Sequence, residues 1–196
     1  EMAFTKNYSI LADLPMFWDP DKIPENKYHP HYHPDMPTRF AIIPRYGNEE
    51  DIRWFEAKPT YVLHWMNAYE EGDEIVLDGY FQDQPNPPPL AGLPPGPGKL
   101  MSNIDLVSLQ TKLHRWRFNL KTGETTEEHL DEQVLEFGSF NQKYAGIKNR
   151  YNYSVYNKPG WFLFTGIVKH DYETGKKTQL EFGKDRYGSE APFAPR

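Results

Sequence analysis

The apolar and aromatic residues of the chain fall into short runs, and turn residues separate these runs. Runs rich in valine, isoleucine, tyrosine, phenylalanine and tryptophan are typical of β-strands. The predicted strands are residues 8–12, 39–45, 60–66, 74–81, 113–120, 150–156 and 160–168. No window keeps a helical period over three turns, and the best helix candidates, 50–56 and 124–132, are short and polar. The pattern therefore predicts an all-β fold.

Two of the predicted hairpins resemble each other. The segment RFNLKTGETTEE around Gly123 and the segment KHDYETGKKTQL around Gly175 both read as a strand, a Thr-Gly turn and a second strand. The two glycines are 52 residues apart. A strand-rich repeat of this length is typical of β-propeller blades, although a β-sandwich could also contain two similar hairpins. At this period the chain supplies fewer than four blades, and open sheet edges are expected.

Composition and charge exclude several classes of protein. The chain has 196 residues, which is long enough for one domain with a sizeable core. Its net charge is -6 and its basic residues form no stripe, which argues against nucleic acid as a partner. The absence of cysteine excludes disulfides, thiolate metal sites and a cysteine nucleophile. No apolar run approaches the roughly 20 residues of a membrane-spanning helix, and we expect a cytoplasmic protein without a transmembrane segment.

We interpret residues 1–196 as a single partial domain with a proline-rich surface loop over 82–99. Within this loop, Gly92 to Lys99 superficially resembles a phosphate-binding loop. Its spacing is one residue too long, Leu100 replaces the serine or threonine, and prolines remove the N–H donors. The chain begins at Glu1 inside what reads as a strand, and we expect it to be about half of a longer domain.

Three histidines, His29, His31 and His33, form the most conspicuous group of possible metal ligands. In an extended strand, alternate residues face one side, so the three imidazoles could converge. Neighbouring prolines disturb that geometry, and no apolar shell surrounds the cluster to order the rings. We interpret this segment as a solvated loop, with adventitious metal binding as the alternative.

His64 is a different kind of candidate because it lies within the predicted strand 60–66, between Leu63 and Trp65. A run this apolar predicts burial, and a buried imidazole costs free energy unless its nitrogens are satisfied. By itself the pattern leaves two roles open for His64, a hydrogen-bonded core residue or a metal ligand.

Two carboxylates, Glu136 and Glu190, lie beside apolar residues at predicted strand ends. Each could be a loop acid that accepts hydrogen bonds from backbone amides. Each could instead accept the N–H of a metal-bound imidazole, which would fix the ring and raise its basicity. The residues alone do not decide between these roles.

Several separate blocks of the sequence resemble the carotenoid cleavage oxygenase family. The blocks are NAYEEGDEIVLDG, LEFGSFNQKYAGIKNRYNYS, KHDYETG and SEAPFAPR. Two further blocks, AFTKNYSILADLPMFWDP and the segment from HRWRFNL to NQKYAG, are similar to the lignostilbene dioxygenase branch of that family. The likeness runs in order along essentially the whole chain.

The resemblance implies part of a seven-bladed β-propeller in which four histidines hold one non-haem Fe(II). It implies that His64 is the third iron ligand and that Glu136 orients it. It implies that Glu190 orients the fourth ligand, which would lie beyond Arg196. The second ligand would directly precede Glu1, and the first would lie further upstream.

The resemblance also implies an activity, namely cleavage of the central C=C bond of a stilbenoid by O2 to give two aldehydes. The expected partners are therefore a small apolar aromatic olefin and O2, and the part of the enzyme in hand is expected to be inactive alone. Two alternatives remain open: a carotenoid or apocarotenoid as the substrate, and a propeller that binds without catalysis. The oligomeric state cannot be predicted from the sequence.

Overall fold

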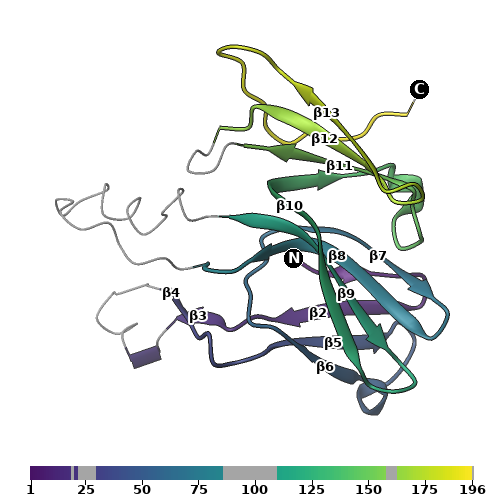
Figure 1. The fold of residues 1–196 in the computed structure, drawn as a ribbon. Helices are drawn as coiled ribbons and strands as arrows, with labels where there is room; N and C mark the ends of the chain where they lie inside the picture. Colours follow the sequence, from purple (N-terminus) through teal and green to yellow (C-terminus); the bar gives the residue numbers. More distant parts are fainter. Residues whose placement is uncertain (19, 22–29, 86–109, 158–162, 196) are drawn as a thin grey trace.

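The computed structural model describes residues 1–18, 20–21, 30–85, 110–157 and 163–195. Its strands are β1 (Ala3–Phe4), β2 (Tyr8–Asp13), β3 (Met16–Trp18), β4 (Pro30–Tyr32), β5 (Thr38–Pro44), β6 (Arg53–Ala57), β7 (Trp65–Glu71), β8 (Glu74–Gln82), β9 (Thr111–Asn119), β10 (Thr125–Ser139), β11 (Tyr151–Tyr156), β12 (Gly166–Asp171) and β13 (Lys176–Glu181). The 3-10 turns η2 (Glu49–Asp51) and η3 (Gln142–Tyr144) lie between strands. No α-helix occurs in these ranges, which confirms the all-β prediction (Figure 1). The segment 124–132, one of the best helix candidates, lies mostly in β10.

The strands form one four-stranded sheet, one seven-stranded sheet and one two-stranded ribbon. The four-stranded sheet has the order β1-β2-β5-β6, and the ribbon pairs β3 with β4. The seven-stranded sheet has the order β13-β12-β11-β10-β9-β8-β7, and all of its pairs are antiparallel. Sequential strands are therefore neighbours throughout this sheet, as in consecutive propeller blades.

The seven-stranded sheet divides within β10, whose two ends pair with different neighbours. Residues Thr125 to His129 and residue Val134 pair with β9, and residues from Leu135 onward pair with β11. Between His129 and Val134 the register against β9 shifts, so β10 bulges just before it changes partner at Leu135. One strand thus completes the unit β7–β10 and begins the unit β10–β13. Together with the first sheet, the described residues form three successive four-stranded units.

The two similar hairpins occupy equivalent positions in two of these units, as the repeat predicts. Gly123 lies between β9 and β10, and Gly175 lies between β12 and β13, so each turn joins the third and fourth strands of its unit. Both glycines have a positive φ, 80° and 69°, which glycine adopts without strain. Each donates its N–H four residues back, to Asn119 and Asp171 respectively.

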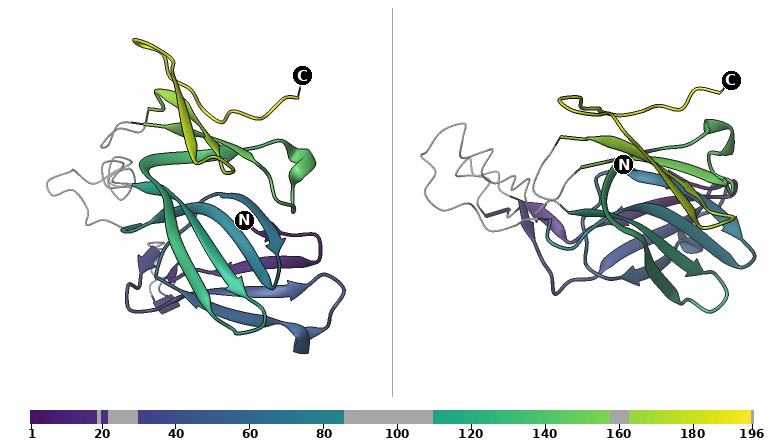
Figure 2. Two further views of the ribbon diagram at one scale, coloured as in Figure 1. Left: turned by 45° about the vertical axis from the view of Figure 1, so that its right-hand side comes forward. Right: turned by 45° about the horizontal axis from the view of Figure 1, so that its top comes forward.

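The core forms two layers, one on each face of the unit β7–β10. Alternate side chains of a strand point to opposite faces. Ile75, Leu77 and Phe81 of β8 therefore pack against the first sheet, together with Phe40 and other residues. Tyr80 faces the other way, into the layer against β10–β13. Figures 1 and 2 show the two neighbouring units on opposite sides of β7–β9, which explains why nearly every residue of β8 is buried.

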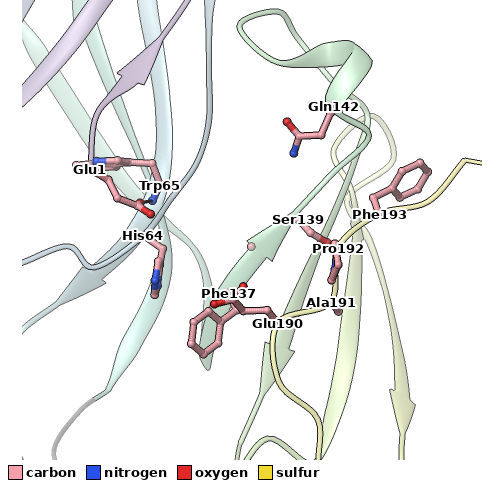
Figure 3. A pocket seen from close by; sticks show the side chains of 11 residues that line it. Glu1, His64, Trp65, Phe137, Ser139, Gln142, Glu190, Ala191, Pro192 and Phe193 are labelled. Atoms are coloured by element: carbon pink, nitrogen blue, oxygen red, sulfur yellow. Dashed lines mark hydrogen bonds between the residues drawn. The ribbon is translucent and has the colours of Figure 1, made fainter.

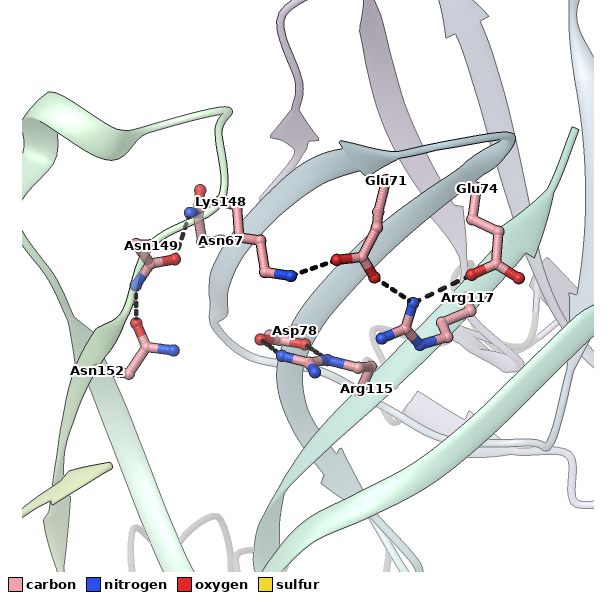
Figure 4. A network of polar contacts seen from close by, with 9 residues as sticks. All are labelled: Asn67, Glu71, Glu74, Asp78, Arg115, Arg117, Lys148, Asn149 and Asn152. Carbon is pink, nitrogen blue, oxygen red and sulfur yellow. Dashed lines mark hydrogen bonds and ion pairs between the residues drawn. The ribbon is translucent and has the colours of Figure 1, made fainter. Parts of the chain in front are cut away.

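An amide side chain fixes the loop between β10 and β11 to strand β7. The Nδ2 group of Asn67, a buried residue, donates to the backbone oxygens of Tyr144 and Ile147 and to Oδ1 of Asn149. Its Oδ1 accepts the N–H of Gly146 at 3.1 Å. Figure 4 shows this side chain beside Asn149. The loop is thereby held in one place relative to the neighbouring unit.

Charged groups join the same two units close to Asn67 (Figure 4). Arg115 of β9 forms two parallel hydrogen bonds of 2.8 Å with the carboxylate of Asp78 on β8. Asp78 is 1% exposed, and the guanidinium lies 4.9 Å from the ring centroid of Tyr172. Glu71 pairs with Lys148 and Arg117, and these contacts lower the pKa of Glu71 to about 2.

The histidine cluster is partly strand rather than loop. His31 lies in β4 opposite Phe17, and the ring of His33 stacks on Phe17 with centroids 4.2 Å apart. Both histidines are half-buried. The loop prediction is wrong for His31, which lies in β4, whereas His33 follows β4 in an irregular segment but packs on Phe17 instead of facing solvent. Pairing with β3 supplies the apolar contact that the sequence did not reveal. His29 lies outside the described residues, as do residues 86–99 of the proline-rich segment and the start of the predicted strand 160–168.

A pH-dependent stability is expected at the hairpin of β9 and β10. Buried His114 contacts Glu127 through Nε2 at 3.1 Å and His129 through Nδ1 at 2.8 Å. Burial lowers the pKa of His129, and the charge of His114 lowers it further. A lowered pKa means that the unfolded chain binds the proton more tightly. The stabilisation is therefore complete above the ordinary pKa of about 6.5 and is lost as the pH falls below it.

The measurement is the thermal unfolding midpoint of the full-length protein between about pH 7.5 and about pH 5.5. His129→Asn, which keeps a donor but does not titrate, should show a smaller fall than the wild type. Equal falls for the two proteins would show that His129 is not responsible.

Candidate metal centre

Strands β1, β7 and β10, one from each of the three units, meet at one cleft, which has a volume of about 340 Å³. Its lining comes from the residue before β1, the start of β7, the end of β10 and the segment after β13. The lining residues are Glu1, His64, Trp65, Phe137, Gly138, Ser139, Gln142, Glu190, Ala191, Pro192 and Phe193. Figure 3 shows His64, Trp65 and Glu1 on one wall and Phe137 and Glu190 on the other.

His64 lies in this cleft, but neither its burial nor its place in a strand matches the prediction. Strand β7 begins at Trp65, and the preceding residues 62–64 are irregular. The side chain of His64 is 31% exposed, and Leu63 is 41% exposed. The prediction of burial is wrong for His64 because the apolar run spans the approach to β7, where this side chain reaches the cleft instead of the core.

Glu136 binds His64, as the orienting role requires. Its Oε2 lies 2.7 Å from Nδ1 of His64, although 72 residues separate them in the sequence. This hydrogen bond raises the pKa of His64, while partial burial acts in the opposite direction. The negative charges of Glu1 and Glu190 contribute further to the rise. The cleft therefore favours a positive charge on this imidazole.

Because the carboxylate of Glu136 is buried, its ionised form needs a positive group nearby to offset the cost of burial. Glu136 is 5% exposed and lies within β10, so it is not a loop acid. Its Oε1 is buried and has no hydrogen-bond partner among the described residues. A buried carboxylate is costly unless a positive group compensates it. The imidazole of His64 can supply this charge by taking up a proton or by binding a metal ion through Nε2.

The described residues contain no group of three or more histidine, cysteine or acidic side chains that could hold a metal ion. His64 nevertheless has the arrangement of a single ligand, because Glu136 occupies Nδ1 and so fixes the tautomer that leaves Nε2 for the metal. The donor set of the described residues thus fits one histidine of an iron site and does not complete that site.

Glu190 reaches the same cleft from the segment after β13, and it is exposed. The structure thus brings His64, Glu136 and Glu190 together, whereas His31 and His33 do not line this cleft. The predicted role of Glu190 toward a fourth ligand stays a prediction.

Sequence reasoning missed two residues of the site, Glu1 and Phe137. Oε2 of Glu1 accepts the N–H of Trp65 at 3.0 Å and so fixes the backbone next to His64. The ring of Phe137 lies 4.8 Å from that of His64, and its N–H donates to Oε2 of Glu136 at 2.7 Å. No signal for the contact of Glu1 exists in the sequence. Phe137 could have been suspected, since it directly follows Glu136.

A second cleft of about 370 Å³ adjoins the first and shares Glu1, Trp65, Gly138 and Gln142 with it. Most of its remaining lining is apolar. These residues are Met2, Ala3, Phe4, Met66, Asn67, Ala68, Phe140 and Ala145. The space beside His64 therefore continues along strands β1 and β7, where both polar and apolar side chains line it.

Comparison with known proteins identifies the family of this chain. The family model described as retinal pigment epithelial membrane protein (RPE65) matches residues 1–196. The chain belongs to the carotenoid cleavage oxygenase (RPE65) family. A carotenoid 9,10(9',10')-cleavage dioxygenase 1 of Pisum sativum is 34% identical over 211 residues, and a carotenoid cleavage oxygenase of Mycobacterium tuberculosis is 27% identical over 248 residues.

The chain spans less than half the length of these carotenoid cleavage oxygenases, 37% of the Pisum sativum protein and 46% of the mycobacterial one. Among solved structures, the lignostilbene dioxygenase of Pseudomonas brassicacearum matches all of this chain and 42% of its own, with a TM-score of 0.81 and 23% identity. A cobalt-substituted apocarotenoid oxygenase (ACO) of Synechocystis matches 92% of this chain with a TM-score of 0.75. At these identities the structures show the fold, which is that of the family's β-propellers.

No helix in the described ranges is long and apolar enough to cross a membrane.

Proposed function

We propose that the chain is the part of an Fe(II)-dependent dioxygenase that supplies His64 as one iron ligand, and that the enzyme cleaves a C=C bond of a carotenoid or apocarotenoid. The observation that carries the proposal is the buried Glu136 bound to Nδ1 of His64. Family membership supports the same reaction class.

The residues of this chain would act by binding and orienting. Glu136 accepts the Nδ1–H of His64, which directs Nε2 toward the cleft and makes the imidazole a stronger donor. The bound iron would supply activation of O2 for addition across the double bond. The ring of Phe137 lines the cleft and packs beside the imidazole, with ring centroids 4.8 Å apart.

Polar and apolar residues line both clefts, and apolar side chains such as Phe137, Met66 and Phe140 could contact an apolar substrate there. The relatives in the sequence comparison at 34% and 27% identity are described as carotenoid-cleaving enzymes, which favours a linear polyene over the stilbenoid that the sequence blocks led us to expect. A stilbenoid remains the second candidate because two blocks of the sequence resemble the lignostilbene branch.

The test uses the full-length protein loaded with iron and incubated with an apocarotenoid and, separately, with a hydroxylated stilbene under 18O2. The reaction adds the two atoms of one O2 to the two carbons of the cleaved bond, so two labelled carbonyl products are expected from the apocarotenoid. Cleavage of the stilbene but not of the apocarotenoid would contradict the proposed substrate class and support the proposed reaction. Cleavage of neither compound by iron-loaded protein would contradict the proposed function.

A further inference from the structure

Phe137 has a backbone conformation that aromatic residues rarely adopt. Its φ is 49°, and Asp185 is the only other non-glycine residue with a positive φ in the described part of the chain. The left-handed region brings Cβ of an L-residue too close to the following carbonyl oxygen, so the conformation costs free energy. Such strain persists where surrounding contacts impose it, and it often occurs at functional sites.

The conformation places the Phe137 N–H on the carboxylate that holds His64. Oε2 of Glu136 accepts this N–H at 2.7 Å, and the same oxygen contacts Nδ1 of His64 at 2.7 Å. The register of β10 against β11 shifts between Glu136 and Ser139, so Phe137 lies in a bulge. The bulge therefore directs a backbone donor onto Glu136 rather than into the sheet.

The side chain of Phe137 acts on the same imidazole from its other side. Its ring centroid is 4.8 Å from that of His64, with an interplanar angle of 39°. Phe164 supports the ring edge-on at 5.3 Å and 80°. The imidazole is thus held by a carboxylate at Nδ1 and by an aromatic ring against its face.

Close packing leaves this bulge little freedom to relax. A Cβ at the next residue, Gly138, would lie 2.6 Å from Cε of Met66 and from the hydroxyl oxygen of Tyr80. A side chain here would have to displace the ends of Met66 and Tyr80, so glycine favours this close approach of β10 to β7 and β8. The neighbouring strands impose the position of the bulge, and with it the strained conformation of Phe137.

We propose that Phe137 is a positioning residue for His64, which fixes the Glu136 carboxylate through its strained backbone and the imidazole through its ring. The inference rests on the proposed function insofar as the oriented nitrogen, Nε2 of His64, serves to bind iron. Nothing in the inference requires Phe137 to touch the substrate.

The test compares Phe137→Leu, which removes the ring but keeps the backbone N–H, with Phe137→Tyr, which keeps the ring. In the full-length protein, the dissociation constant for iron, measured by chelator competition, should rise about tenfold for Phe137→Leu and stay near the wild-type value for Phe137→Tyr. The electron paramagnetic resonance spectrum of the ferrous protein with nitric oxide should change only in Phe137→Leu. Iron affinity and spectrum identical to the wild type in Phe137→Leu would overturn the inference.

Two further results separate this inference from the proposed function. The proposed function is supported if the wild-type protein binds iron and the His64→Ala variant does not. This holds for any result with Phe137→Leu. If the wild type holds no iron, crystal structures decide the inference alone. The imidazole should then be rotated and the contact between Nδ1 and Glu136 lengthened beyond 2.7 Å in Phe137→Leu, and an unchanged imidazole would overturn it.

Discussion

Replacing His64 by alanine in the full-length protein is expected to reduce bound iron to background and to abolish C=C cleavage. His64 is the histidine of the described residues that lines the cleft, and Glu136 fixes its tautomer through a 2.7 Å contact. Loss of the imidazole removes a ligand and also leaves a buried carboxylate without a positive partner. The measurements are iron content by mass spectrometry and product formation under the same conditions.

The matched control replaces His29, His31 and His33 by alanine together. His31 and His33 do not line the cleft, so iron content and activity should remain close to those of the wild type. The outcome that contradicts the assignment is equal iron content in wild-type protein and His64→Ala.

Asp78→Asn is expected to cause the largest loss of stability among single changes away from the cleft. The carboxylate of Asp78 is 1% exposed and forms two parallel bonds with Arg115, whose side chain is 12% exposed. Removing the charge leaves a guanidinium buried between two units of the seven-stranded sheet without a counter-ion. Breaking such a pair typically costs about 3–5 kcal/mol. The measurement is the free energy of unfolding in urea.

The matched control removes both charges by combining Asp78→Leu with Arg115→Met. Apolar residues of similar volume often replace a buried ion pair at little cost, so the double variant should be more stable than Asp78→Asn. Should Asp78→Asn unfold within about 1 kcal/mol of the wild type, the ion pair would not be a main source of stability.

The sequence predicts local features of the fold well. The apolar runs and the turns at Gly123 and Gly175 depend on residues close together in the chain, and both hairpins occur as predicted. The pairing of Glu136 with His64 was accessible only through the family resemblance, because 72 residues separate the two in the sequence.

What the sequence could not predict depends on contacts between distant strands. The apolar run around His64 predicts burial, yet the residue lies before β7 and faces a cleft that three units form together. The positive φ of Phe137 arises from the packing of a bulge against β7 and β8, not from the preference of phenylalanine itself. Likewise, nothing near Asn67 indicates that its amide holds a loop about 80 residues further along the chain.

The bulged strand β10 limits where the length of this chain can change. Its first half is held by β9, Asp131 within the bulge bonds His170 and Lys177, and its end carries Glu136. An inserted residue between Asp131 and Glu136 would turn that carboxylate to the opposite face of the sheet. Insertions at the exposed turn of Gly123 would leave the register of β9 and β10 intact. Labels and fused tags thus belong at the hairpin turns, while β10 should tolerate substitution better than any change in its residue count.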